Sequence, residues 1–153
     1  MVSLLVFISL VAAAAAVGSH FGPGPWYLAL QKPGWTPPNW LFAPIWTLIY
    51  VGIALAGWLV WRVKNAERVK PLMLWSAQLI LNALWSWIFF GLQRPDLAFA
   101  DIVLLLIVIC GFIVSVRKTS LPAAWLYVPY AIWVGFASAL NFTIWRLNPI
   151  TSG

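Results

Sequence analysis

A line of polar and aromatic side chains runs through an otherwise apolar stretch of the sequence. Trp75, Gln78, Asn82 and Trp85 recur at spacings of three and four residues, which places them on one face of a helix. Amide side chains within an apolar segment need hydrogen-bond partners, so this face is expected to look into a bundle of helices. Two interpretations stay open: hydrogen bonds that join helices, or the polar contacts of an aromatic-walled pocket for a small molecule.

A second stripe of the same kind lies near the end of the chain. It comprises Tyr130, Trp133, Ala137 and Asn141, and a third apolar stretch begins with Trp46 and Tyr50. Aromatic side chains from several helices provide stacking and dispersion contacts to flat rings. The pattern therefore predicts a cavity suited to a large, flat aromatic ligand.

Few other residues offer chemistry. Asp101 is an acid within an apolar run, and it is expected either to pair with Arg146 or to accept hydrogen bonds from loop N–H groups or tryptophan indoles. A proton-coupled transporter is the alternative for Asp101, but no second acid or histidine accompanies it. His20 and Cys110 are single, which excludes a histidine cluster for zinc, a Ser-His-Asp triad and an intrachain disulfide. No metal site and no required cofactor are predicted.

The composition indicates a membrane protein. Hydrophobic residues make up 63% and charged residues 8% of 153 residues, against about 45–50% and about 25% in soluble domains. Nine Lys and Arg against three Asp and Glu give a net charge of +6, which we interpret as loops facing anionic lipid and not as a nucleic-acid surface. Twelve residues are tryptophan.

Five apolar segments are long enough to position these side chains across a bilayer. Their ranges are 2–19, 44–61, 71–90, 97–116 and 123–145. Pro44, Pro71 and Pro122 are expected at or just before helix starts, and Pro129 is expected to kink the fifth helix or to mark its first turn. The predicted fold is an all-α integral membrane bundle of five transmembrane helices, with residues 1–153 as a single domain. Residues 1–18 also resemble a signal peptide, but they lack a basic start and are expected to stay as a helix.

The connection 21–43 is long and rich in proline and tryptophan. Its tryptophans, Trp35 and Trp40 among them, could anchor the chain at the membrane interface, but the regular prolines favour a folded lid over a pocket. Six cations fall on the side of the N-terminus and three on the side of this loop, which predicts a cytoplasmic N-terminus and an outer loop in a bacterial cell membrane.

Three segments resemble the translocator protein and tryptophan-rich sensory protein (TspO/MBR) family. They are WYLALQKPGWTPPNWLFAPIWTLIY at 26–50, AQLILNALWSWIFFG at 77–91 and PYAIWVGFASALNFTIWRLN at 129–148. The resemblance implies a homodimeric five-helix protein that binds porphyrins, such as protoporphyrin IX, and isoquinoline- or benzodiazepine-type drugs beneath the first loop. A sensor or carrier of tetrapyrroles is the expected function. Light- and oxygen-dependent degradation of protoporphyrin IX and transport of small lipophiles are the alternatives.

The resemblance also implies particular site residues. It places Trp46, Tyr50, Gln78, Asn82, Trp133 and Ala137 in the pocket, with Trp46 and Trp133 as the candidates for any photochemistry. Trp35, Trp40 and Asn141 complete the expected ligand contacts, and Lys32, Arg94 and Arg146 are expected to hold porphyrin carboxylates at the mouth. The sterol-recognition pattern of the family is incomplete, because Phe142 stands where a tyrosine is required. Sterol binding is therefore in doubt.

Overall fold

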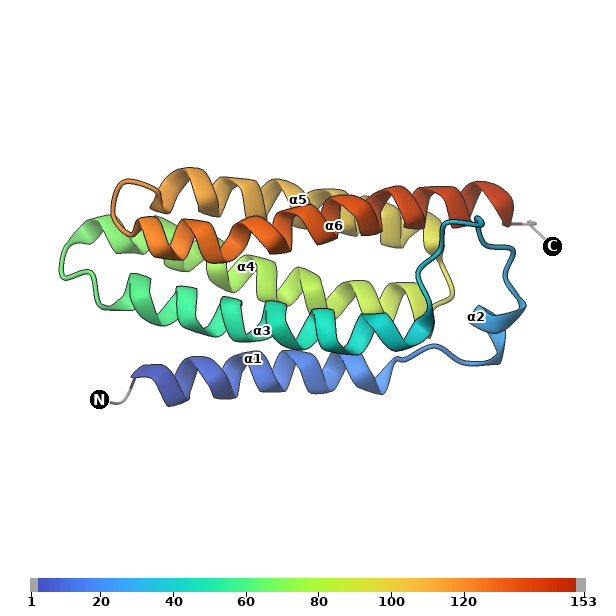
Figure 1. The fold of residues 1–153 in the computed structure, drawn as a ribbon, viewed down its shortest axis with the longest axis horizontal. Helices are drawn as coiled ribbons and strands as arrows, with labels where there is room; N and C mark the ends of the chain where they lie inside the picture. Colours follow the sequence, from blue (N-terminus) through green and yellow to red (C-terminus); the bar gives the residue numbers. More distant parts are fainter. Residues whose placement is uncertain (1–2, 151–153) are drawn as a thin grey trace.

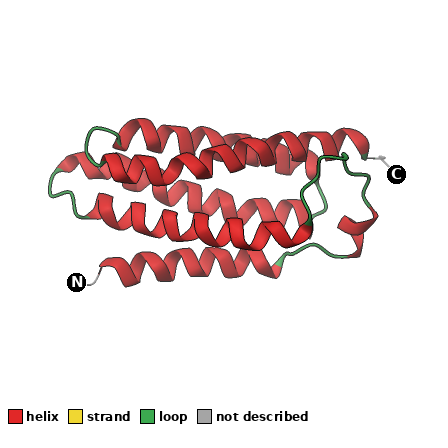
Figure 2. Cartoon of the chain, viewed as in Figure 1, coloured by secondary structure: helices red, strands yellow, loops and turns green. Residues whose placement is uncertain are grey.

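Long helices lie side by side in this structure, a computed structural model that describes residues 3–150 (Figures 1 and 2). Within this range there are five helices of eighteen residues or more and no strand: α1 (Ser3–His20), α3 (Asn39–Trp61), α4 (Val69–Ser86), α5 (Pro95–Val116) and α6 (Leu121–Leu147). Each packs against two main neighbours, in the order α1, α3, α6, α5, α4 and back to α1. The helices thus form a closed ring around a shared interior.

The surface of the bundle is apolar. Four helical segments of the described chain are long and apolar enough to cross a membrane, namely Asn39–Trp61, Ala66–Gly91, Pro95–Val116 and Leu121–Leu147, and α1 contributes a shorter apolar helix. Large apolar side chains are exposed on every long helix, for example Leu5, Leu48, Met73, Ile107 and Ile132. Such a surface is stable against lipid and not against water. The all-helical membrane fold is therefore confirmed.

Helix α3 begins five residues before the predicted start at Pro44. Pro38 is extended, with φ −61° and ψ 144°, and the helix follows it directly at Asn39. Pro44 therefore lies inside α3, where its nitrogen cannot donate to the carbonyl of Trp40. Pro129 is likewise inside α6 and does not mark its first turn, because α6 begins at Leu121.

The end of α4 nearest the connection between α1 and α3, called the loop-side end below, is irregular (Figure 1). It continues as a π-helical segment, η2 (Trp87–Gly91), in which the N–H of Leu92 donates to the carbonyl of Trp87 at 2.8 Å. The chain then turns through Gln93, whose φ of 55° is left-handed, and enters α5 at Pro95. At the other end of the bundle, α3 is joined to α4 through the short η1 (Ala66–Arg68).

The connection between α1 and α3 is folded against the bundle. It contains the short helix α2 (Pro25–Ala29), whose Tyr27 is buried with its ring centroid 6.2 Å from that of Phe89 and 5.5 Å from that of Phe90. Burial raises the pKa of the Tyr27 hydroxyl, so this group stays neutral. Lys32 donates to the carbonyl of Leu30 and lies over the Tyr27 ring, 4.6 Å from its centroid.

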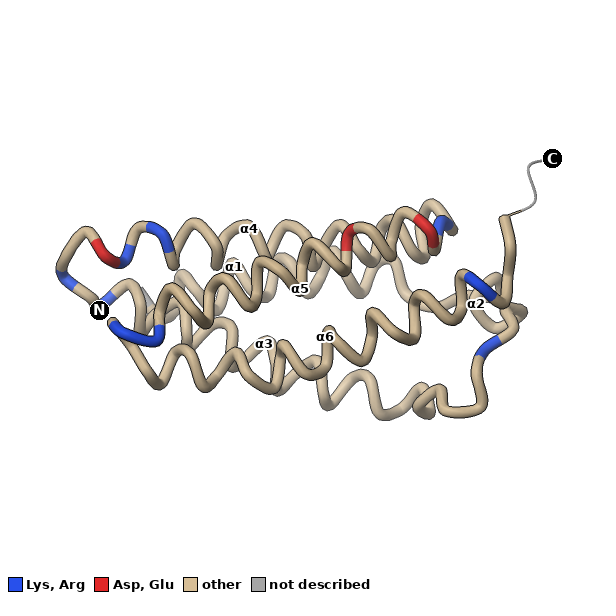
Figure 3. Tube along the Cα trace, turned by 90° about the horizontal axis from the view of Figure 1, so that it is seen from above, with Lys and Arg blue, Asp and Glu red and all other residues tan. Residues whose placement is uncertain are grey.

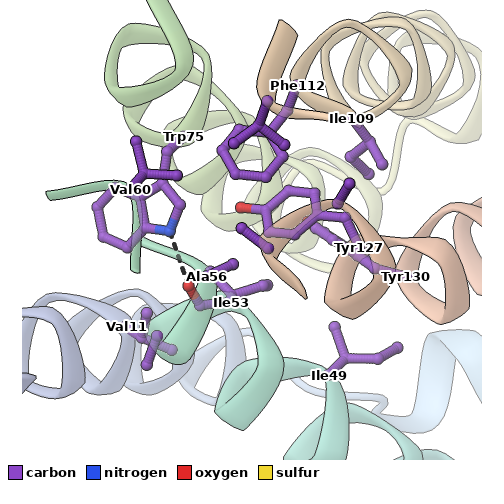
Figure 4. Close-up of a cluster of buried hydrophobic side chains, with 14 of the residues drawn as sticks. Val11, Ile49, Ile53, Ala56, Val60, Trp75, Ile109, Phe112, Tyr127 and Tyr130 are labelled. Atoms are coloured by element: carbon purple, nitrogen blue, oxygen red, sulfur yellow. Dashed lines mark hydrogen bonds between the residues drawn. The ribbon is translucent and has the colours of Figure 1, made fainter. Parts of the chain in front are cut away.

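The interior holds two clusters of buried apolar side chains. The larger joins all five long helices and includes Ile53, Trp75 and Tyr127 (Figure 4). The smaller lies at the loop-side end, around Tyr27 and Phe89. Most charged residues gather at the two ends of the bundle, as Figure 3 shows. This distribution matches helices whose middle sections face lipid.

Candidate functional site

A cavity of about 400 Å³ opens where the two apolar clusters meet. Its walls come from α1, α3, α4, η2, α5 and α6, and Phe21, Gly22, Pro23 and Tyr27 of the first connection line its loop side. Small-molecule sites usually measure about 300–1,000 Å³ and are mainly apolar. The cavity falls within that range, and no charged side chain lines it within residues 3–150.

Three indoles form the aromatic walls of the cavity. The ring of Trp46 on α3 lies 5.5 Å from Tyr50, and Trp133 on α6 meets Phe42 edge to face at 5.5 Å. Trp85 on α4 stacks on Phe89 at 5.0 Å. Each indole is held by a second ring, so the walls are prearranged for a flat partner.

A chain of hydrogen bonds leads from the cavity wall into the core. Tyr50 Oη donates to Asn82 Oδ1 at 3.2 Å, and Asn82 Nδ2 donates to Tyr130 Oη at 2.9 Å. Tyr130 in turn donates to Gln78 Oε1 at 2.8 Å. This chain joins α3, α4 and α6. Asn82 therefore links helices, as the first interpretation of the polar stripe expects, and it also lines the cavity.

A second polar contact fixes the opposite wall. Trp85 Nε1 donates to Asn141 Oδ1 at 3.0 Å, and Asn141 Nδ2 donates to the carbonyl of Pro95 at 2.8 Å. Asn141 thus ties α6 to α4 and to the first turn of α5. Trp133 differs, because its buried Nε1–H has no hydrogen-bond partner within residues 3–150. An unpaired buried donor is costly, and in a cavity wall it is available to an acceptor on a ligand.

The structure brings six of the nine expected ligand contacts to this cavity: Trp46, Tyr50, Asn82, Trp133, Ala137 and Asn141. The other three lie elsewhere. Gln78 is fully buried behind Tyr130, Trp35 packs edge to face on Phe136 at 5.7 Å, and Trp40 is 72% exposed at the start of α3. Neither Trp35 nor Trp40 lines the cavity.

Sequence reasoning missed the contribution of α1. Ala15, Gly18 and Ser19 line the cavity, and a Cβ added at Gly18 would lie 3.4 Å from Ser86 Oγ and 3.8 Å from Tyr50 Oη. Small residues one turn apart allow this close approach of α1 to α3 and α4. The spacing of these small residues could have predicted that α1 packs closely here, although it does not indicate that a ligand binds.

None of the expected rim cations lines the cavity. The Lys32 ammonium group donates to the carbonyl of Leu30 and lies over the ring of Tyr27. Arg94 forms a bidentate pair with Asp96. Arg94 and Arg146 instead line a separate pocket at the start of α5 and the end of α6.

The expected pairing of Asp101 is wrong. Its Oδ2 is buried and has no hydrogen-bond or ion-pair partner among residues 3–150, although the carboxylate lies near Tyr130. Asp101 is six residues beyond Pro95, about 9 Å deeper along α5. Arg146 is exposed at the last turn of α6 and does not reach down to it.

Asn148 attaches the connection between α1 and α3 to the end of α6. Its side chain accepts from the N–H of Gln31 at 2.9 Å and donates to the carbonyl of Gln31 at 2.8 Å, while also donating to the carbonyl of Ile144. This pairing copies the two hydrogen bonds of a β-ladder. These two are the side-chain hydrogen bonds found between the connection and the end of α6 among the described residues.

Replacing Asn148 with alanine is expected to loosen this connection without unfolding the bundle. Two hydrogen bonds to Gln31 are lost, each worth about 0.5–1.5 kcal/mol. Amide exchange at 24–36 should rise several-fold while exchange within α3 and α5 stays unchanged. The matched control is Thr143→Ala, whose hydroxyl bonds only within α6; equal exchange in the two variants would contradict the assignment.

The fold and the cavity define a helical membrane protein with an aromatic cavity between its helices. The sequence matches the TspO/MBR family over residues 4–146, and the chain belongs to this family. It is 45% identical to the tryptophan-rich protein TspO of Chlorobaculum tepidum over 152 residues, covering 96% of each chain. It is 41% identical to protein CrtK of Rhodobacter capsulatus, covering 94% of this chain and 91% of the relative. It is 37% identical to the human translocator protein, covering 86% and 82%. The protein is thus a multi-pass integral membrane protein.

Proposed function

We propose that the cavity binds porphyrins, such as protoporphyrin IX, and drug-like lipophiles of similar flatness, and that the protein acts as a tetrapyrrole sensor or carrier. The observation that supports this most directly is the set of three indoles, Trp46, Trp85 and Trp133, around one uncharged cavity. Stacking on such walls favours flat aromatic rings, and the free Nε1–H of Trp133 offers one directional contact.

The proposal includes the arrangement in the membrane. We infer that α1 is a fifth span, because Phe7, Val11 and Ala14 are buried against the bundle while Leu5 faces outward. Five cations lie in the connections at the end opposite α2, namely Arg62, Lys64, Arg68, Arg117 and Lys118, and Lys70 lies beside them in the first turn of α4. By the excess of positive charge inside, that end faces the cytoplasm and α2 lies outside.

A second candidate function is light-dependent degradation of the bound porphyrin. Trp46 and Trp133 line the same cavity from α3 and α6, so both indoles lie within reach of one bound ring. A porphyrin supplies the photochemistry when bound. In this alternative molecular oxygen is the oxidant and the light-excited porphyrin ring is the species oxidised, and the two indoles flank that ring.

A titration with protoporphyrin IX tests both functions. We expect saturable binding by the purified protein in detergent, followed in the dark by the shift of the porphyrin Soret band. Replacing both Trp46 and Trp133 with phenylalanine should weaken binding by about tenfold, because two large stacking surfaces shrink. Trp125→Phe is the control, since Trp125 is 65% exposed near the opposite end of α6.

Three outcomes separate the alternatives. Saturable binding with no new absorbance band under illumination supports the sensor or carrier. A light-dependent band that the double variant lacks supports the degrading enzyme. No saturable binding, or equal loss in the Trp125 control, would overturn the porphyrin assignment.

A further inference from the structure

A second pocket lies at the loop-side end of the bundle, outside the cavity. It measures about 460 Å³ and is lined by Arg94, Asp96, Trp145, Arg146, Pro149 and Ile150. It is formed by the start of α5 and the end of α6 together with the residues that follow α6. No residue is shared with the lining of the cavity.

The two arginines of this pocket differ in their surroundings. Arg94 donates from Nε and Nη2 to the two carboxylate oxygens of Asp96, at 2.8 Å and 2.6 Å, and its side chain remains 44% exposed. This pair holds the guanidinium in one orientation and leaves Nη1 free to donate. Arg146 is exposed and has no hydrogen bond or ion pair among residues 3–150. The three charges sum to +1, which favours an anion.

An aromatic strip continues from the pocket toward the middle of the bundle. Trp145 contacts Phe99 of α5 at 5.9 Å and Phe142 of α6 at 6.0 Å between ring centroids, and Phe99 and Phe142 are 5.2 Å apart. Phe142 is 44% exposed and lies one turn deeper than Arg146. The pocket and this aromatic strip, which together are called the groove below, are therefore cationic at the end of the helices and apolar beneath.

We propose that this groove binds an anionic phospholipid of the loop-side leaflet. Arg94 and Arg146 hold the phosphate, and one acyl chain lies over Phe142 and Phe99. Guanidinium groups match phosphate oxygens in charge and geometry. A free phosphate would use only the arginines, and a sterol carries no anion for them. Along the helices the arginines come first and the phenylalanines follow, which matches a phospholipid with its charged headgroup at the surface and its acyl chains beneath.

The test measures lipid retention by native mass spectrometry. Purified protein in detergent is offered dioleoyl phosphatidylglycerol or dioleoyl phosphatidylcholine. We expect one phosphatidylglycerol to be retained in preference to phosphatidylcholine, and Arg146→Gln combined with Arg94→Gln to weaken that retention by about tenfold or more. Arg146→Gln alone breaks no hydrogen bond or ion pair within the described chain and should give part of the loss.

Matched variants keep the result interpretable. Lys64→Gln with Arg117→Gln removes the same charge at the opposite end and should leave the preference intact. Phe142→Ser should weaken dioleoyl more than dihexanoyl phosphatidylglycerol, and inorganic phosphate at millimolar concentration should not displace the dioleoyl lipid. Protoporphyrin binding, measured in parallel, should be unchanged in the arginine variants.

Four results would overturn the proposal. If the double arginine variant retains phosphatidylglycerol as well as the original protein does, the lipid does not bind at this site. Equal loss in both charge variants means that net charge alone attracts the lipid. Displacement by inorganic phosphate assigns the pocket to the free ion. If the arginine variants lose porphyrin binding but still retain the lipid, the arginines bind the ligand of the cavity and not a phospholipid.

Discussion

Replacing Gly57 with alanine is expected to lower the midpoint of thermal unfolding by several degrees. A Cβ at this position would lie 2.6 Å from Phe7 Cδ1 and 2.7 Å from Trp75 Cε2 and Nε1, closer than carbon atoms pack. Neither ring can move away easily. Trp75 is 3% exposed and donates from Nε1 to the carbonyl of Ile53 at 2.8 Å (Figure 4).

The strain falls on the packing of α1. Phe7 meets Trp75 edge to face with ring centroids 4.9 Å apart, so the added methyl group pushes α1 away from α3 and α4. Overpacking of this kind costs about 1–3 kcal/mol, from which the gain of about 1 kcal/mol in helix propensity is to be subtracted. We expect the net loss to appear in thermal unfolding in detergent.

Gly135→Ala is the matched control. Gly135 also lies inside a long helix, α6, but nothing lies within 4 Å of its added Cβ. This variant should be as stable as the original protein or slightly more stable. If both alanines change the midpoint equally, the close approach at Gly57 does not govern the packing of α1.

The extent of most helices follows from hydropathy, and the largest difference at a helix start occurs at a proline. The ends of α5 and α6 lie within two residues of the prediction, because polar or charged residues bound each apolar run. The start of α3 differs by five residues, because a proline was expected to begin the helix at Pro44. Pro38 already ends the extended chain, and a helix tolerates one missing hydrogen bond near its start.

Residues that line the cavity could be predicted from the sequence where their helical spacing places them on one face of a helix. Asn82, Trp133 and Asn141 belong to stripes that only one helix face can present. Gln78 shares a stripe with Asn82, yet it lies one turn deeper behind Tyr130. The depth of a residue along a helix relative to a cavity depends on how neighbouring helices are staggered, which periodicity does not contain.

Side chains at helix ends were the least predictable. Arg94 was expected at the mouth of the cavity, but the bidentate contact with Asp96, two residues away, directs it elsewhere. The abundance of tryptophan also has two separate causes. Trp46, Trp85 and Trp133 line the cavity, whereas exposed rings such as Trp40 and Trp125 lie near helix ends, where amphipathic rings favour the membrane interface.

Tyr130→Phe is expected to destabilise the bundle, whereas Tyr127→Phe is not. Both tyrosines are buried on α6, with their rings 5.5 Å apart. The Tyr130 hydroxyl accepts from Asn82 and donates to Gln78, so its removal leaves two buried polar groups without partners. Each such group costs about 1–3 kcal/mol, and we expect a loss of about 2–4 kcal/mol in the free energy of unfolding.

The Tyr127 hydroxyl is buried but has no hydrogen-bond partner within residues 3–150. Its ring stacks on Phe112 with centroids 4.0 Å apart, and phenylalanine preserves that contact. Removing an unsatisfied hydroxyl is neutral or stabilising by about 1 kcal/mol. The two variants delete the same atom from the same helix, so the difference between their unfolding midpoints isolates the hydrogen bonds.

Ligand affinity gives a second readout for the same pair. Asn82 lines the cavity and is oriented by Tyr130, whereas Tyr127 does not line the cavity. Tyr130→Phe should therefore weaken protoporphyrin binding as well as stability, and Tyr127→Phe should leave binding unchanged. Equal stability of the two variants would show that the chain from Tyr50 to Gln78 does not hold the cavity wall. If Tyr130→Phe lowers stability but leaves the affinity for protoporphyrin unchanged, the hydrogen bonds from Tyr50 to Gln78 only join helices and do not contribute to binding.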